Sequence, residues 1–193
     1  MAGDVNKASV WTNADCWIGI SDDPTMPTDV ATPLDEEDWG LVGLLSGDNG
    51  FQESRDEDTD DKYAWGSILV RTTHSHHKRT VKFTALEDNE NTLRLVNPGS
   101  KRTETGGITK TSVVVPKYGK FPMVFETRES TTVKRKLCDS CEVQEIGDII
   151  EAESELTMYE VTVVVYPDAD GHLWDELKGE VPEDDDEDGN PSP

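Results

Sequence analysis

The sequence predicts a mainly β protein, a sandwich or barrel-like fold with one short flanking α-helix. Runs rich in Val, Thr, Phe and Tyr are separated by Gly, Pro or charged turns along most of the chain, which is typical of strands. One segment differs: it opens with a capping-box sequence, Thr84-x-x-Glu87, and ends at Asn97-Pro98-Gly99, where a helix would stop. With 193 residues, the chain is long enough for one domain with a real core.

The expected strands are spread over the chain and joined by polar connections. Residues 21–38 hold three prolines and many acids, so we expect a loop or an extended arm. The sequence HSHHK at 74–78 is expected to be a turn between two strands, and 99–107 a flexible loop. The strands are expected at 14–20, 39–46, 63–73, 79–85, 108–116, 121–129, 131–146 and 154–167.

One domain is expected over residues 1–179, followed by an acidic tail at 180–193. Residues 1–13 are expected to form an extended N-terminal arm. Residues 47–62 are polar and acidic and cannot bury enough apolar surface to order themselves. Because such long loops inside a domain are usually functional or disordered, we expect 47–62 to be a long loop with a role in function.

The expected helix at 84–96 is short and must pack against the sheets to be stable. Thr84 and Glu87 are expected to cap its first turn. Helical spacing places Asn89 on the apolar side, where its side chain should be hydrogen-bonded to backbone. The other residues expected on this side are Ala85, Leu86, Leu93 and Val96.

The chain is strongly acidic, and the acidity is not confined to its C-terminal end. Lys plus Arg is 18 and Asp plus Glu is 41, which gives 18 − 41 = −23. Removing the seven acids of residues 180–188 still leaves −16. This charge argues against nucleic-acid binding, which needs cations facing phosphate, and against anionic membranes. It suits a protein that must stay soluble or must not adhere to DNA.

The sequence shows no sign of secretion or of a membrane span. No apolar run approaches the ~20 residues of a spanning helix, and the first residues lack the apolar core of a signal peptide. The three cysteines are an odd number, which does not fit a secreted disulfide framework. We therefore expect synthesis in a reducing cytosol.

Cys138-x-x-Cys141 is half of a zinc site, and His74, His76 and His77 could supply the other half. The alternative is that the histidines form a solvated turn and the cysteines lie near the end of a strand. Strict strand alternation then places the two cysteines on opposite faces, and there is no second Cys-x-x-Cys in the sequence. We therefore favour the absence of a metal site.

Two further kinds of site are not favoured. Asp168-Ala-Asp170-Gly171 resembles part of a calcium loop, but Tyr166 and Leu177 stand where an EF-hand needs acids, so we expect a turn. The phosphate-binding, dinucleotide-binding, metalloprotease and serine-hydrolase motifs are all missing from the sequence. We expect no enzyme activity and no cofactor.

Several short motifs, taken in order, resemble the major tail protein of long-tailed, non-contractile bacteriophages (siphoviruses). These are WGLVGLLSGDNGF, an acidic stretch, YAWGSILVRT, TVKFTALEDNENTLRLV and YEVTVVVYPDADG, between residues 39 and 171. Leu86-Glu87-Asp88-Asn89 stands where this family often has Leu-Glu-Thr-Asn before its helix. The resemblance is closest to phages of actinobacteria.

The resemblance implies a tail-tube fold and a structural role in the virion tail, with assembly in the host cytoplasm. Subunits of this family form hexameric rings that stack into a tube around a tape-measure protein. A tail terminator and baseplate or tip proteins would complete the tail. The tube later conducts DNA without binding it specifically, and an acidic lumen would repel phosphate. The resemblance also argues against a zinc site.

The N-terminal arm and the 47–62 loop are the natural elements to reach another ring. We expect both to be mobile in the single subunit and to order on stacking. Trp11 lies in the polar arm, and two interpretations stay open: a contact with another subunit, or packing on its own domain. The candidate residues for contacts between rings are Trp11, Phe51, Arg55, Asp58 and Asp61.

Two other functions fit the sequence less well. A tail terminator of the same fold would form single rings rather than tubes. An acidic protein that mimics DNA would block a nucleic-acid enzyme and remain a monomer. The strand-rich spacing and the large polar segments favour the tube, although charge alone does not separate these functions.

Overall fold

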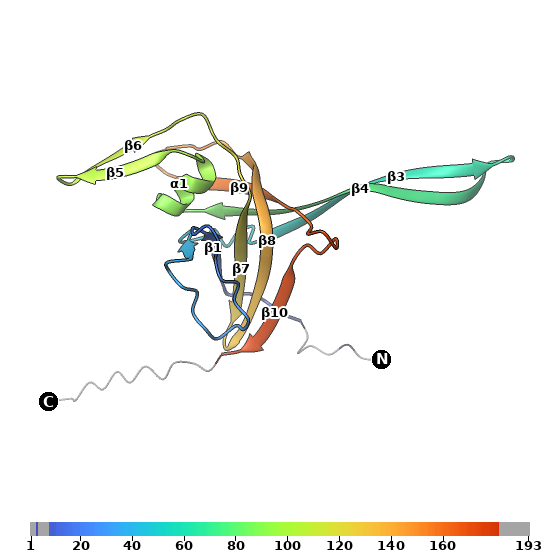
Figure 1. Ribbon diagram of the computed structural model, residues 1–193, viewed down its shortest axis with the longest axis horizontal. Coiled ribbons are helices and arrows are strands. Elements are labelled where there is room, and N and C mark those ends of the chain that lie inside the picture. The colour runs from blue at the N-terminus through green and yellow to red at the C-terminus, as the bar shows by residue number, and fades with distance from the viewer. Residues whose placement is uncertain (1–2, 4–7, 182–193) are drawn as a thin grey trace.

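The computed structural model describes residue 3 and residues 8–181, and these form a mainly antiparallel β structure with one helix (Figure 1). The helix α1 is Glu90–Val96. The strands are β1 (Asn13–Gly19), β2 (Trp39–Leu41), β3 (Gln52–Ala64), β4 (Ile68–Ala85), β5 (Lys101–Thr105), β6 (Ile108–Ser112), β7 (Phe121–Glu129), β8 (Thr132–Ile146), β9 (Tyr159–Val165) and β10 (Asp175–Glu180).

The main sheet forms a barrel-like body. Its strands run in the order β2-β1-β7-β8-β9-β4-β3, with β10 beside β8. Residues 42–46 bridge two strands that are not neighbours in this order. The Val42 N–H donates to the Cys16 carbonyl of β1 (2.9 Å), and the Ser46 N–H donates to the Thr84 carbonyl of β4 (2.9 Å). The predicted sandwich or barrel-like fold with one short helix is confirmed.

The core fills the inside of this body. Val81 and Phe83 alternate with outward-facing residues at the end of β4, as the sequence pattern predicts. Phe51, Phe83 and Phe125 pack edge-to-face with one another, with ring centroids 5.1 to 6.2 Å apart. Such contacts add to the free energy gained by burying the rings.

Residues 21–38 cover the outer face of β7 and β8. The Arg135 guanidinium of β8 donates to the carbonyls of Asp29 (2.9 Å) and Thr32 (2.8 Å) and is buried against Glu126. The expected extended arm is therefore an ordered covering layer. Beneath it lies a small second apolar cluster of Leu34, Trp39, Val124 and Leu137.

The prediction of an unordered loop at 47–62 is wrong from residue 52 onward. Gln52–Ala64 is β3, which pairs with β4 in a long hairpin that projects from the body (Figure 1). The prediction counted only buried apolar surface, whereas pairing with residues 68–82 of β4 satisfies the backbone groups without it. The turn of this hairpin lies at 65–67, with positive φ at Gly66 (83°) and Ser67 (59°).

The expected turn at 74–78 is also wrong, because β4 runs through it. His76 has φ of 57° and lies at a register shift, where Asp56 pairs with Lys78 and Asp58 with Ser75. The extra residue on β4 forms a β-bulge. A bulge and a turn carry the same polar sequence signal, so composition did not separate them.

The helix is shorter than the sequence predicts. Thr84 and Ala85 belong to β4, which stays paired with β9 as far as Ala85. The helix begins after Asn89, so Thr84 and Glu87 form no capping box. Leu93 and Val96 are buried as predicted, whereas Leu86 precedes the helix and is half-buried.

The remaining differences concern strand pairing between polar residues. Residues 99–107 are not a flexible loop, because β5 and β6 form a hairpin whose turn has positive φ at Gly106 (60°) and Gly107 (75°). Strand β10, which pairs with β8, was not predicted. It includes Glu180, the first residue assigned to the acidic tail, and residues 182–193 lie outside the described part of the chain.

Candidate assembly surfaces

The residues around the start of α1 hold the segment that closes the body. The Glu87 carboxylate accepts from the Leu44 N–H (2.8 Å), and the Asn89 amide donates to the Val42 carbonyl (2.8 Å). Because residues 42–46 bridge β1 and β4, these contacts fix that closure. We call Glu87 and Asn89 the helix clamp. The structural role of the Leu86–Asn89 motif is to hold residues 42–46 in place.

Gly43 leaves room for the helix clamp. Its φ is +95°, and a Cβ there would lie 2.5 Å from the Glu87 carboxylate. Only glycine combines this backbone conformation with such a close approach. One contact therefore joins Gly43 to Glu87 and Asn89, which are distant from it in the sequence.

Asn89 is the N-cap of α1. Its Oδ1 accepts from the backbone N–H groups of Asn91 (3.0 Å) and Thr92 (2.9 Å). The prediction that this side chain is hydrogen-bonded to backbone is confirmed. The reason differs, because Asn89 precedes the helix and is not placed by helical spacing.

The two expected halves of a zinc site lie in different parts of the molecule. His74, His76 and His77 are exposed on the hairpin, where they contact Glu57 or Asp58. Cys138 and Cys141 are buried in the core. Among the described residues, no group of three or more His, Cys, Asp or Glu side chains could hold a metal ion.

Cys138 and Cys141 face the same side of β8, not opposite sides as strict alternation predicted. A register shift places Cys138 opposite Met123 and Cys141 opposite Phe121, so β8 has one extra residue there. The hydrogen bond with Cys138 and burial raise the pKa of the Cys141 thiol well above its usual range. Burial likewise raises the pKa of the Cys16 thiol beside them. These thiols are apolar core side chains at neutral pH.

Asp168 forms the turn that the sequence predicts after β9. Its carboxylate accepts from the backbone N–H groups of Asp170 (2.9 Å) and His172 (2.8 Å). The hydrogen bond from the His172 N–H is the main cause that lowers the pKa of this carboxyl below its ordinary value. The acid holds the turn before β10.

The far end of the β3–β4 hairpin is apolar and unusually exposed. Trp65 is 100% exposed and lies in the turn of this hairpin. Sequence analysis placed 63–73 in one strand and missed this site, although apolar residues on both sides of Gly66 were a signal. We call the exposed group the tip cluster: Tyr63, Trp65, Ile68, Leu69 and Val70.

The five predicted contact residues are in three different settings. Arg55, Asp58 and Asp61 are on β3, within the hairpin. Phe51 packs against the core of its own subunit. Trp11 is half-buried, and the Lys178 ammonium lies 5.5 Å from its ring centroid. The structure therefore shows Trp11 in contact with its own domain.

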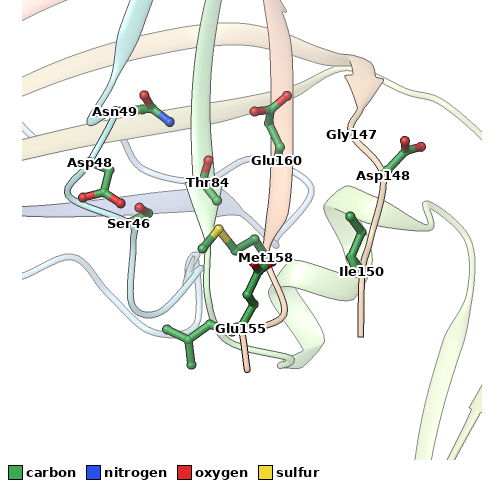
Figure 2. Close-up of a pocket in the computed structure, with 11 residues that line it drawn as sticks. Ser46, Asp48, Asn49, Thr84, Gly147, Asp148, Ile150, Glu155, Met158 and Glu160 are labelled. Carbon is green, nitrogen blue, oxygen red and sulfur yellow. The ribbon is translucent and has the colours of Figure 1, made fainter. Parts of the chain in front are cut away.

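An open hollow lies at the other end of β4 (Figure 2). It has a volume of about 350 Å³, and Figure 2 shows Met158 between Asp48 on one side and Ile150 on the other. No feature of the sequence predicted it. We call it the acidic hollow, because its apolar residues Ile150, Leu156 and Met158 are bordered by Asp48, Asp148, Glu155 and Glu160.

A second hollow of about 620 Å³ lies at the base of the hairpin. Phe51, Phe83 and Phe125 border it, together with Leu44. Lys134 and Lys136 also line it and form salt bridges with Glu176 and Glu53. We call it the aromatic hollow.

The exposed tip cluster and the two hollows are candidate surfaces for assembly. The chain belongs to the phage tail tube protein family, whose model matches residues 12–184. It is therefore a non-enzymatic structural protein of the virion tail, as predicted. A search of curated proteins gave no match. No helix in residues 8–181 is long and apolar enough to cross a membrane.

Proposed function

We propose that the protein polymerises as stacked hexameric rings into the tail tube of a long-tailed, non-contractile phage of actinobacteria. The family match over residues 12–184 is the observation that carries this proposal. The tube surrounds a tape-measure protein during assembly and is completed by terminator and baseplate or tip proteins. It later serves as an acidic conduit for DNA.

The charge of the chain supports the conduit. A net charge of −23 on each subunit would repel phosphate, so DNA would slide past the wall rather than bind. The same charge makes identical subunits repel one another. Assembly must therefore be driven by apolar contacts and by strand pairing between subunits.

The hairpin offers both kinds of contact. Strand β3 ends the sheet order, so its outer backbone edge is available to a neighbouring subunit. The tip cluster provides apolar side chains beyond the body. We therefore assign the reach between rings to the β3–β4 hairpin, with Arg55, Asp58 and Asp61 on it. The N-terminal arm is the second reaching element, and of its residues 1–13 only residue 3 and residues 8–13 are described.

Electron microscopy of the concentrated protein tests this function. Tubes with a regular axial repeat are expected, and assembly should improve with added salt because salt screens repulsion between acidic subunits. Single rings would instead identify a terminator, and monomers at every concentration would contradict self-assembly. Tubes that dissolve as salt rises would show that ion pairs between subunits drive assembly.

A further inference from the structure

The two ends of β4 carry surfaces that complement each other. The tip cluster lies around the start of β4. Thr84, near the end of β4, lines the acidic hollow. We propose that the tip cluster of one copy docks into the acidic hollow of a second copy of this chain. This inference rests on the proposed self-assembly and names the two surfaces that meet.

The tip cluster has the properties of a docking element. Trp65 is fully exposed, and three consecutive apolar residues, 68–70, are each more than half exposed beside it. Monomeric proteins seldom expose such a group together, and a buried Trp often dominates the free energy of an interface. The hairpin needs none of these side chains for its own packing.

Two basic side chains lie next to the tip cluster, opposite each other on the two strands of the hairpin. Lys62 and Arg71 are directly opposite each other, and theirs is the third residue pair from the turn. Lys62 contacts Asp60, whereas Arg71 has no salt bridge among the described residues. When the tip cluster docks, the Arg71 guanidinium, which has no salt bridge among the described residues, is therefore brought to the edge of the docking site.

The acidic hollow matches this combination. Its apolar residues Ile150, Leu156 and Met158 are exposed to solvent rather than packed. Of its four acids, Glu160 pairs with Lys82 (2.7 Å). Asp48, Asp148 and Glu155 have no salt bridge within residues 8–181. An apolar group with a neighbouring cation is the ligand that such a site would favour.

The aromatic hollow is a poorer match. Its floor of Phe51, Phe83 and Phe125 is already packed inside the subunit. Lys134 and Lys136 line it together with the acids Asp15, Asp48 and Glu53, so its charge is mixed rather than acidic. It also lies at the base of the hairpin, and the test below treats it as the competing site.

The separation of the two surfaces explains how copies would stack. Strand β4 has 18 residues, and Thr84 is 16 residues beyond Ile68. At about 3.3 Å per residue, tip and hollow are roughly 50 Å apart along the strand. A contact between different surfaces at opposite ends is head-to-tail, and it adds copies in one direction when the rotation between copies does not close a ring. Figure 1 shows the hairpin pointing away from the end of β4 beside α1.

Site-specific cross-linking tests the contact in the full chain. A photoreactive benzoylphenylalanine replaces Trp65 in one sample and Ile108, exposed at the tip of the β5–β6 hairpin, in a control sample. After assembly and irradiation, mass spectrometry should find cross-links from position 65 within residues 147–158. Cross-links from position 65 to Phe125, Thr127 or any other residue that does not line the acidic hollow would overturn the inference.

A mixing experiment tests the same contact without a cross-linker. Trp65→Ser removes the tip, and Leu156→Asp removes the hollow; both positions are exposed, so folding should be intact. Each variant alone should raise the concentration needed for stacking by about tenfold or more. An equal mixture should restore one junction, seen as paired rings in electron micrographs.

Leu44→Asp is the matched control, because Leu44 is 68% exposed in the aromatic hollow and Leu156 is 67% exposed in the acidic hollow. The control should stack like the wild type. If Leu44→Asp blocks stacking and Leu156→Asp does not, the docking site is wrong while the proposed function stands. If the wild type itself never assembles, the proposed function fails and this inference fails with it.

Discussion

The barrel-like body and the β3–β4 hairpin use the same antiparallel pairing, but only the body buries its side chains. Strand β4 passes through both. Its residues are exposed from Ile68 to His77 except for Thr73, and they become buried from Val81 to Ala85 except for Lys82. One strand therefore has a half that serves folding and a half that is free to serve assembly. The two properties should be separable by mutation.

Hydrogen exchange should show the largest contrast. Amides of β4 around Val81 and Phe83 should exchange only through global unfolding, with a protection of about 5–15 kcal/mol. Amides of residues 56–72 should be nearly unprotected in the single subunit, because an isolated two-stranded hairpin is marginal in water. In the assembled tube they should become protected.

The measurement compares the single subunit and the tube under one buffer condition. The β7 strand is an internal control, since its protection should be high in both states. Equal protection of residues 47–62 in the subunit and the tube would contradict ordering on stacking.

Replacing an aromatic residue by alanine should give the next largest difference between the body and the hairpin, measured as free energy of unfolding. Phe83→Ala removes a buried ring that contacts Phe51 and Phe125, and it should lower the free energy of unfolding by about 3–5 kcal/mol. Trp65→Ala removes a larger ring with no burial in the subunit, so its effect should stay within about 0.5 kcal/mol. Chemical denaturation of the dilute subunit measures both. A large loss of stability in Trp65→Ala would show that the tip packs on its own chain.

The helix clamp should give a smaller loss. Asn89→Ala removes the N-cap and the contact with the Val42 carbonyl, and it should cost about 1–2 kcal/mol in free energy of unfolding. Asn89→Asp keeps the cap acceptor and loses the donor to Val42. If both variants were equally destabilised, the contact with Val42 would matter more than the cap.

The sequence predicted the strands that have a buried face and, within 108–116, the exposed strand β6, but it missed the other strands without a buried face. Residues 121–129 coincide with β7, because Met123 and Phe125 alternate with residues facing the other way. Strands β3, β5 and β10 are mostly exposed along their length, so no hydrophobic period marks them. Their order comes from backbone pairing with a distant or neighbouring strand, which composition does not reveal.

The candidate surfaces, too, were predicted only where a sequence pattern marks their residues. Asn89 was predicted to be hydrogen-bonded because a polar residue among apolar ones needs a partner. The acidic hollow combines residues near 48, 84, 148 and 156, and only the fold brings them together. The apolar residues on both sides of Gly66 were a signal for a turn at Trp65, but composition does not reveal that this turn projects from the body and leaves the ring exposed.

The smallest effect concerns the covering layer over β7 and β8. Hydrogen bonds from the Thr25 N–H and the Ser21 hydroxyl lower the pKa of the Asp38 carboxyl below its ordinary value. Because the pKa is depressed in the folded state, the stabilisation is present above the unfolded pKa and is lost as pH falls through the folded one. Asp38→Asn removes this titration.

Denaturation curves should therefore converge at low pH: wild type and Asp38→Asn differ at pH 7, and they become similar as pH falls below the ordinary Asp pKa of about 3.9 and through the lower pKa of the folded state. Glu36→Gln is the control for removing a carboxylate from the same layer, because the Glu36 side chain is exposed. A difference between wild type and Asp38→Asn that stays constant with pH would mean that the covering layer is held by packing on Trp39 and Leu34 and not by the charge of Asp38.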